Sequence, residues 1–475
     1  MFIALLVAYH VLFFWRIYSQ PFSVARSELL STFFPSWVHL GRGEKHDAFF
    51  WGNYHSHPVL STYYPPHFLS SLVGARLGLG RQFVTLLFSV CCHSLFGSIG
   101  WYLLILGWSN PYVALFGAIT LTYSAYNIKQ QPCILYTIGW FPWLLLGIAN
   151  QNLWLSSLSF GMVLLSGYYP IGIQMVMVAI ASSLIWNVSL LWILLGGLIG
   201  LPQLIPFLNY LPKTIRTRPP GDKGIIPAWH LLSLFVPKLF RLSKVSGVGY
   251  WEMNYYVGIV PLVLLLLYAS KSAVWLLGIV SLTLMLGAFR RHLPRIPARW
   301  CFSFQFALGW LATVAFNNCC IDSKVWLSLI LLQAFDLWLN NSFLTVTSPF
   351  SELPKKPSLA FNTRLTRFLE ANLGDARVSG LPYPLFTGHV NRLRTLGYSG
   401  GMQTKEMATF RGDTNPDGSG EHDWFQSHTH KDDDRLTRYG VKYAFSRKRL
   451  AWPATSVRNL YENPQYSTVH RNQQE

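Results

Sequence analysis

The chain has 475 residues, of which 51% are hydrophobic and 12% are charged, and its formal net charge is +18 at pH 7. This composition is typical of multi-spanning membrane proteins. Lys and Arg lie between hydrophobic stretches and in the tail, without a basic helical stripe, which argues against nucleic acid as the partner. Phosphate, on membrane lipids or on a lipid-linked substrate, fits these charges better.

Eleven hydrophobic stretches are long enough, or nearly long enough, to cross a bilayer. They lie at residues 1–18, 82–107, 111–126, 133–150, 153–169, 170–186, 189–210, 254–269, 273–289, 300–317 and 324–340. The first has no basic n-region and no cleavage site, so we expect an uncleaved span and not a signal peptide. The pattern predicts a polytopic α-helical membrane protein with about eleven transmembrane helices.

Two long connections, 19–81 and 211–253, fall on the same side of the membrane if the spans alternate. Residues 1–341 contain only seven acidic residues, and five of them lie in these connections: Glu28, Glu44, Asp47, Asp222 and Glu252. A carboxylate beside a bilayer is costly to hold, so this gathering of acids on one face indicates a functional site.

Glu28 opens the first connection and has two interpretations. It could be a charge favouring the N-terminus of an interfacial helix over 29–40. Alternatively, it could be a general base at the mouth of a membrane cavity, where partial desolvation raises the pKa of a carboxyl group.

The same connection continues with aromatic, amide and imidazole side chains, among them Trp51, Asn53, His57 and Tyr64. Such residues suit stacking and hydrogen bonding to a sugar, and they equally suit a membrane-interface belt. The histidines lack a helical ligand pair with an acid, so no metal site is predicted.

The second connection is basic, and it includes Lys244. Its stretch 229–237 predicts a helix lying in the membrane interface, and Glu252 immediately precedes a hydrophobic stretch. Further on, the prolines of 290–300 forbid a continuous helix. Arg295 and Arg299 at this break could fork onto phosphate oxygens, or they could snorkel to the lipid surface.

The tail, 349–475, holds 13 of the 20 acidic residues and no hydrophobic span. Residues 377–381 and 441–446 read as short strands and 404–434 as a loop, which predicts a small soluble α+β domain. The predicted domains are therefore 1–348, the transmembrane domain, and 349–475.

Sidedness is in conflict with one rule. If the N-terminus is cytoplasmic, both long connections and the tail lie outside, yet the positive-inside rule favours the opposite orientation. We keep the connections outside, because a site for an anionic lipid phosphate needs basic residues on its own face.

The order of several motifs resembles the YfhO-like family of bacterial multi-spanning glycosyltransferases of the GT-C type. The motifs are Glu28, the loop from Trp51 to Pro66, Gly167-Tyr168-Tyr169-Pro170, Pro202-Gln203-Leu204-Ile205-Pro206, Glu252-Met253-Asn254-Tyr255-Tyr256-Val257-Gly258, Arg295-Ile296-Pro297-Ala298-Arg299, Arg438-Tyr439-Gly440-Val441-Lys442-Tyr443 and Tyr461-Glu462-Asn463-Pro464.

The resemblance implies a GT-C-like fold in the bacterial cytoplasmic membrane and an inverting sugar transfer on the outer face. A polyprenyl-phosphate donor would supply the sugar to a cell-envelope glycan or lipid. It also implies that Glu28 is the catalytic carboxylate, although most relatives carry Asp there.

These expectations assign Glu28 as general base and Arg295, Arg299 and Lys244 as ligands of the donor phosphate. Substrate hydroxyl groups would be held by Glu252, Tyr255, Trp51, Asn53, His57 and Tyr64. No cofactor is expected, and a donor without a diphosphate does not require a divalent metal.

Two alternatives are a transporter or flippase of lipid-linked glycans and a catalytically inactive envelope scaffold. Transporters typically carry paired repeats and ionisable residues within their spans. The spans here are nearly free of charge and no repeat is visible, so the sequence favours the enzyme.

Overall fold

The structure is a computed structural model of the chain. It describes residues 1–19, 34–42, 61–77, 79–128, 132–215, 226–237, 239, 254–268, 274–286, 297–319, 322–341, 364–379, 393, 395–396, 403–404, 437, 440–445, 453–458 and 460–463. Most of these residues are helical. The chain divides into two compact units: unit 1 comprises Met1–Val24, Leu87–Ile205 and Arg218–Ser351, and unit 2 comprises Ala25–Leu86, Pro206–Thr217 and Glu352–Glu475. The predicted domain boundary at 348 lies outside the described residues.

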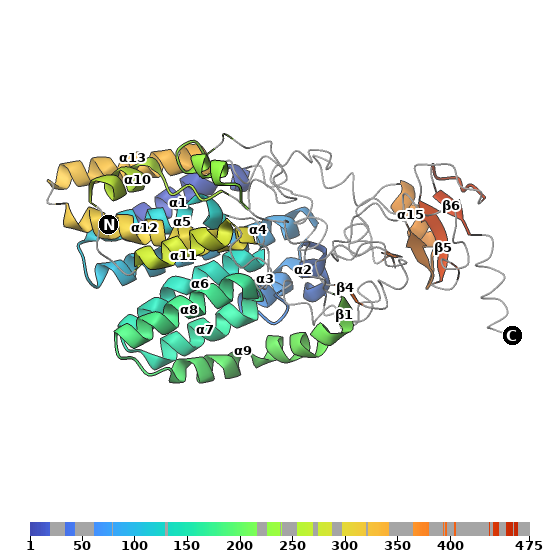
Figure 1. The fold of residues 1–475 in the computed structure, drawn as a ribbon. Coiled ribbons are helices and arrows are strands. Elements are labelled where there is room, and N and C mark those ends of the chain that lie inside the picture. The colour runs from blue at the N-terminus through green and yellow to red at the C-terminus, as the bar shows by residue number, and fades with distance from the viewer. Residues whose placement is uncertain are drawn as a thin grey trace. The chain divides into compact units, whose positions relative to one another are not determined.

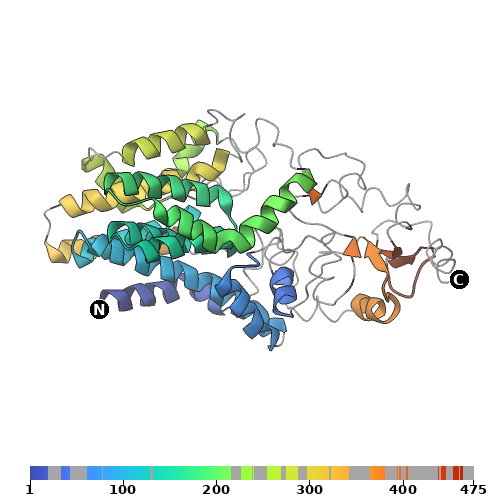
Figure 2. The ribbon, with the colours of Figure 1, turned by 90° about the horizontal axis from the view of Figure 1, so that it is seen from below.

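Unit 1 is a bundle of helices that lie side by side (Figures 1 and 2). Its helices are α1 (Phe2–Ser19), α4 (Leu79–Leu106), α5 (Pro111–Tyr123), η5 (Ala125–Ile128), α6 (Pro132–Ala149), α7 (Leu153–Ser166), α8 (Tyr169–Ile185), α9 (Leu191–Tyr210), η7 (Ala228–Leu234), α10 (Ile259–Leu267), α11 (Val274–Met285), η9 (Pro297–Trp300), α12 (Cys301–Asn318) and α13 (Ser323–Asn341), with the first turns of α4 and the last residues of α9 assigned to unit 2. Each of the eleven predicted hydrophobic stretches overlaps one of the α-helices. The helical class of the fold is therefore confirmed.

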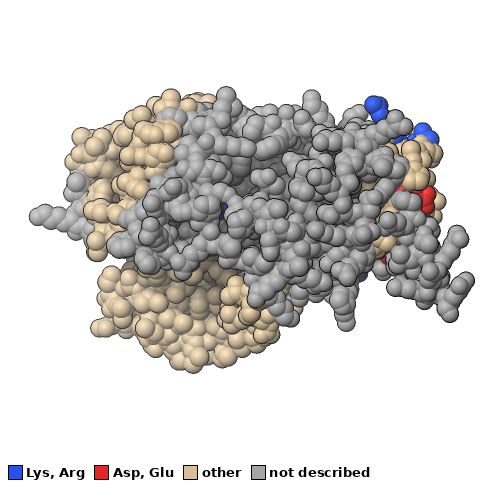
Figure 3. Space-filling model, turned by 45° about the vertical axis from the view of Figure 1, so that its right-hand side comes forward, with Lys and Arg blue, Asp and Glu red and all other residues tan. Residues whose placement is uncertain are grey.

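By length and composition, three of the described helices could cross a membrane: Arg81–Leu106, Pro132–Ala149 and Leu191–Tyr210. Several shorter helices are also apolar, and they present large apolar side chains outward, such as Leu266 (80% exposed) and Trp154 (77% exposed). On the face drawn in Figure 3, the described surface over the helices is almost free of charged side chains. These features fit a membrane protein, whereas the number of spans and their orientation stay predictions.

α5 is the central helix of unit 1. All residues from Val113 to Tyr123 are buried, and the helix packs against α1, α12 and α13. A helix that is apolar all round belongs inside a protein or in lipid, and here protein surrounds it. Asn110 caps its N-terminus, because its side-chain oxygen accepts hydrogen bonds from the N–H groups of Tyr112 and Val113.

α10 begins five residues later than the hydrophobic pattern suggests. The pattern runs from 254, but Asn254–Gly258 are non-helical and the helix starts at Ile259. Gly258 adopts φ +104° and ψ 157°, a backbone conformation that residues other than glycine rarely adopt. This glycine fixes the point at which the chain turns into α10.

Unit 2 contains the short helices α2 (Phe34–Gly41) and α3 (Pro65–Ala75), which pack against each other. The indole of Trp37 lies directly on Gly74, where a Cβ atom would collide with the ring, and its Nε1 donates to Ser70 Oγ at 3.0 Å. A glycine at 74 is therefore required for the close approach of the two helices.

The C-terminal part of unit 2 is a small sheet with one helix, α15 (Arg364–Asn372). The strand order is β3 (Thr395–Leu396), β2 (Arg377–Ser379), β5 (Val441–Phe445) and β6 (Leu460–Glu462). β2 is parallel to β3 and β5, and β6 is antiparallel to β5. Elsewhere in unit 2, β1 (Thr214–Ile215), preceded by η6 (Leu211–Lys213), pairs antiparallel with β4 (Gln403–Thr404).

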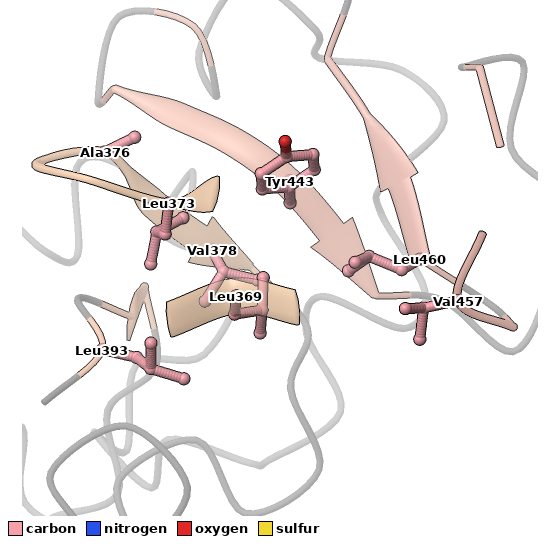
Figure 4. Packing of buried hydrophobic residues seen from close by; sticks show 8 residues of the cluster. All are labelled: Leu369, Leu373, Ala376, Val378, Leu393, Tyr443, Val457 and Leu460. Carbon is pink, nitrogen blue, oxygen red and sulfur yellow. The ribbon is translucent and has the colours of Figure 1, made fainter. Parts of the chain in front are cut away.

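The core of this small domain consists of eight buried side chains, with Leu369, Val378 and Leu460 fully buried (Figure 4). The alternation of apolar residues predicted strands at 377–381 and 441–446, and β2 and β5 confirm both. The described residues of this part thus form a helix and a sheet, as the α+β prediction requires.

Candidate functional site

Three of the ten predicted site residues lie in the described part of the chain: Tyr64, Tyr255 and Arg299. The other seven lie outside the described residues, and their roles stay predictions: Glu28, Trp51, Asn53, His57, Lys244, Glu252 and Arg295. The candidate site is therefore built from Tyr255 and Arg299 in unit 1 and from the groups that contact them.

Arg299 lies in η9, immediately before α12. Its side chain is only 7% exposed, and its guanidinium carbon lies 5.6 Å from the centre of the Tyr168 ring. A guanidinium over an aromatic face is stabilised by the negative face of the ring, and more so where water is excluded. The contact joins two stretches of the family resemblance, 295–299 and 167–170.

The backbone around Arg299 is also fixed. Gln174, in the second turn of α8, donates from Nε2 to the carbonyl oxygens of Arg299 (3.1 Å) and Pro170 (3.0 Å). Ser303, in the first turn of α12, donates to Gln174 Oε1 at 2.5 Å. Because these groups are buried, their loss would leave unsatisfied polar atoms, so they hold η9 firmly on α8.

The first turn of α12 also contacts Asn254–Gly258. The carbonyl oxygen of Tyr256 accepts hydrogen bonds from Gln305 Nε2 (2.9 Å) and from the N–H of Ala125 (3.0 Å). Gln305 Oε1 in turn accepts from the N–H of Tyr126 at 3.0 Å. Gln305 therefore connects η5, α12 and the segment that precedes α10.

α13 supplies two further contacts to this segment. Gln333 Nε2 donates to the carbonyl oxygen of Val257 at 2.8 Å, and the Gln333 amide lies where a Cβ of residue 258 would be. Asp336 accepts from the Tyr256 hydroxyl, with its two oxygens at 2.8 and 2.7 Å, and from the N–H of Ile259 at 2.9 Å. Asn340 Nδ2 donates to the same carboxylate at 2.8 Å.

Sequence reasoning missed Asp336. It lies within the predicted span 324–340. It was overlooked because the spans were regarded as nearly free of charge. The signal that could have found it is the presence of a carboxylate inside an otherwise apolar stretch, which indicates a functional or structural role by default.

Tyr255 is fully buried, and its ring packs edge-on against Phe304 at 5.8 Å between centroids. Its hydroxyl lies 3.4 Å from Nδ1 of His230, in the 3-10 helix η7. His230 is also fully buried, and desolvation lowers its pKa to about 4. The imidazole is therefore neutral at physiological pH.

η7 occupies the stretch predicted to lie in the membrane interface. It turns His230 and Ser233 inward, while Trp229, Leu232 and Phe235 are 50%, 53% and 57% exposed. The division into a buried polar face and an exposed apolar face fits an interfacial helix.

Tyr64 belongs to unit 2 and precedes α3. It is fully buried, and its backbone N–H donates to the carbonyl oxygen of Ser61 at 3.0 Å. Its proposed contact with substrate stays a prediction, and burial of the ring gives it at least a packing role.

Within the described ranges, no group of three or more His, Cys, Asp and Glu side chains could hold a metal ion. Three histidines of the first connection, His55, His57 and His67, were considered for a metal site, and of these His67 is buried in α3. The other two, His55 and His57, lie outside the described residues.

Comparison of the chain with protein-family models and with curated proteins found no match. The resemblance to the YfhO-like family thus rests on the sequence motifs alone.

Proposed function

We propose that this protein is a membrane glycosyltransferase of the GT-C type that moves a sugar from a polyprenyl-phosphate donor to a cell-envelope glycan or lipid. The supporting observation is the convergence of three motifs on the start of α12. Arg299 contacts Tyr168, while Phe304 and Gln305 contact Tyr255 and Tyr256. The motifs 167–170, 252–258 and 295–299 are distant in sequence, and a shared role explains why they meet.

Arg299 suits the donor phosphate because a guanidinium offers a planar fork of N–H donors to phosphate oxygens. Its stacking on Tyr168 orients that fork before a ligand arrives, which reduces the entropy lost on binding. Arg295 and Lys244 would add charge against the leaving phosphate.

In the proposed reaction, an acceptor hydroxyl oxygen attacks the anomeric carbon and its proton passes to Glu28. The bond between the anomeric carbon and the phosphate oxygen breaks, and its electron pair leaves with the lipid phosphate. The arginines neutralise the charge that develops there, so no general acid is required. Glu252, Trp51, Asn53 and His57 would hold hydroxyl groups, whereas the buried Tyr255 and Tyr64 would shape the site.

The site is proposed to face the outside of a bacterial cytoplasmic membrane, with the C-terminal domain on the same side. Fusions of a periplasm-active and a cytoplasm-active reporter after Glu475 test this orientation. Activity of the outside reporter supports the proposal. Activity of the inside reporter would remove it, because polyprenyl-phosphate sugars would then be presented on the other face.

Sugar transfer is then assayed in membranes with Glu28→Gln and Arg299→Gln. Glu44→Gln, in the same connection as Glu28, is the matched control. Loss of transfer in both variants, with normal transfer in the control, supports the roles assigned. Unchanged transfer in Glu28→Gln at normal protein levels would refute the role of Glu28 as the general base.

One observation favours a second candidate, a transporter or flippase of lipid-linked glycans. Asp336 lies inside a predicted span, beside a non-helical segment and the start of a short helix, and such broken helices form binding sites in transporters. A fluorescent lipid-linked glycan in proteoliposomes would discriminate the two. Translocation without any sugar transfer would replace the enzyme with the transporter.

A further inference from the structure

The N-terminus of α10 is occupied by a group of the protein itself. The first N–H groups of a helix and its dipole favour a negative charge, and here the N–H of Ile259 donates to Asp336 Oδ2 at 2.9 Å. In transporters, the N-terminus of a broken helix can bind a substrate anion. At the N-terminus of α10, this position is filled by the carboxylate of Asp336 from α13.

The neighbours of Asp336 that contact its oxygens are all hydrogen-bond donors. They are the Tyr256 hydroxyl, the backbone N–H of Ile259 and the side-chain amide of Asn340. A bound cation would need acceptor oxygens around it, whereas these three groups direct O–H and N–H hydrogens at the carboxylate. The surroundings of the carboxylate therefore donate hydrogen bonds to it in one fixed geometry.

Asn254–Gly258 lacks the hydrogen bonds of a helix or sheet, so side chains replace them. The carbonyl groups of Tyr256 and Val257 bind Gln305 and Gln333, and the Asn254 side chain accepts from the N–H of Tyr256 at 3.1 Å. In an apolar surrounding, non-helical backbone is tolerated only where its polar groups are satisfied in this way. Asp336 completes the set at the C-terminal end of the segment.

We infer that Asp336 is a positioning residue: it anchors Asn254–Gly258 between α12 and α13 and so fixes the position of Tyr255 within this segment. The anchoring itself follows from the described contacts. Its consequence for catalysis rests on the proposed function, in which Tyr255 shapes the site.

The test compares Asp336→Asn with Asp322→Asn. Asp322 lies just before α13, is exposed, and accepts from the N–H of Lys324 at 2.8 Å, so the control makes the same change at the opposite end of the same helix. A nitroxide spin label on Ile259→Cys, at the exposed first residue of α10, in the full-length protein in lipid reports the mobility of that position. We expect a more mobile spectrum in Asp336→Asn and an unchanged one in Asp322→Asn. An unchanged spectrum in Asp336→Asn overturns the inference.

Asn at 336 keeps one acceptor oxygen but places an NH₂ group against donors, which could prevent folding. Tyr256→Phe is therefore the second variant, because it removes the hydroxyl that contacts both carboxylate oxygens and keeps the ring. It should also mobilise the label at 259. An immobile label in a folded Tyr256→Phe protein counts against the inference whatever the fate of Asp336→Asn.

Transfer kinetics separate this inference from the proposed function. If both hold, Asp336→Asn lowers kcat by about 10- to 100-fold, the size expected for misplacement of a reacting group by about 1 Å, with little change in the donor KM. A mobile label without any measurable transfer in the wild-type protein would refute the enzyme and keep the anchor. Normal transfer with an immobile label in Asp336→Asn would refute the anchor and keep the enzyme.

Discussion

The guanidinium group of Arg299 lies over the ring of Tyr168, with 5.6 Å between its central carbon and the ring centre. Arg299 lies in η9, immediately before α12, and Tyr168 immediately precedes α8. Through this pair, a buried positive charge is held in one orientation at the junction of two helices.

Removing the Tyr168 ring should weaken binding of the donor phosphate. Tyr168→Leu loses a desolvated cation–π contact of about 2 kcal/mol, which corresponds to about a 30-fold rise in donor KM. Tyr168→Phe keeps the ring and should stay close to the wild-type value. Equal KM values for the Leu and Phe variants would show that the ring does not orient Arg299.

Gly258→Ala should strongly destabilise unit 1. Alanine is strained at φ +104° and its Cβ would collide with the Gln333 amide, so we expect a loss of about 3 kcal/mol or more in the free energy of unfolding. Gly197→Ala in α9 is the control, because no atom lies within 4 Å of a Cβ at that position. Thermal unfolding in detergent measures both variants, and equal melting temperatures would contradict the assigned role of Gly258.

Stability should fall as the pH is lowered from about 6.5 to about 4, in part because of His230. Its folded-state pKa is lowered to about 4, while the unfolded chain takes up the proton near 6.5. Over this range the unfolded state binds more protons, so acid favours unfolding, and the contribution of His230 is fully present only above 6.5.

His230→Phe keeps a ring against Tyr255 and removes the titration. The melting temperature of this variant should therefore depend less on pH between 6.5 and 4 than that of the wild-type protein. Identical pH profiles for the two proteins would mean that other groups carry the whole effect.

Asn463→Ala should loosen the C-terminal domain. Asn463 is buried, and its Nδ2 donates to Thr437 Oγ1 (3.0 Å) and to the carbonyl oxygen of Val441 (2.9 Å). Loss of these bonds should cost about 1–3 kcal/mol and speed proteolytic cleavage of this domain in the full-length protein.

The matched control is Asn372→Ala. The Asn372 side chain is exposed and bonds only locally, from Nδ2 to the carbonyl oxygen of Phe368 at 2.7 Å, so cleavage should change little. Equal cleavage rates in the two variants would contradict a structural role for the 461–464 motif.

The positions of the helices could be read from the sequence because uninterrupted apolar stretches are a local signal. The start of α10 could not, since it depends on a glycine conformation and on side chains from α12 and α13, which are far away in sequence. The strands at 377–379 and 441–445 followed from local alternation, whereas their parallel pairing depends on the fold as a whole.

The site was predictable only in part, for the same reason. Arg299 was found because prolines interrupt the chain just before it. Its partner Tyr168 belongs to one of the motifs, but nothing in the sequence pairs it with Arg299. Its supports Gln174 and Ser303 carry no local signal, because a buried glutamine or serine in an apolar helix looks like an ordinary polar residue. Asp336 could have been noticed as a carboxylate within an apolar stretch, but the interpretation considered only the acidic residues of the two long connections.

The complete enclosure of α5 has a consequence for biosynthesis. Two of its polar groups, Thr120 Oγ1 and the carbonyl oxygen of Tyr123, are bonded by Gln333 and Asn341, which lie 213 and 218 residues further along the chain. Until those residues have been synthesised, α5 lacks two of its final partners, so the centre of the bundle completes its assembly late although it is made early. A substitution near 333–341 would then act as a late assembly defect and would be felt at a helix that was synthesised much earlier.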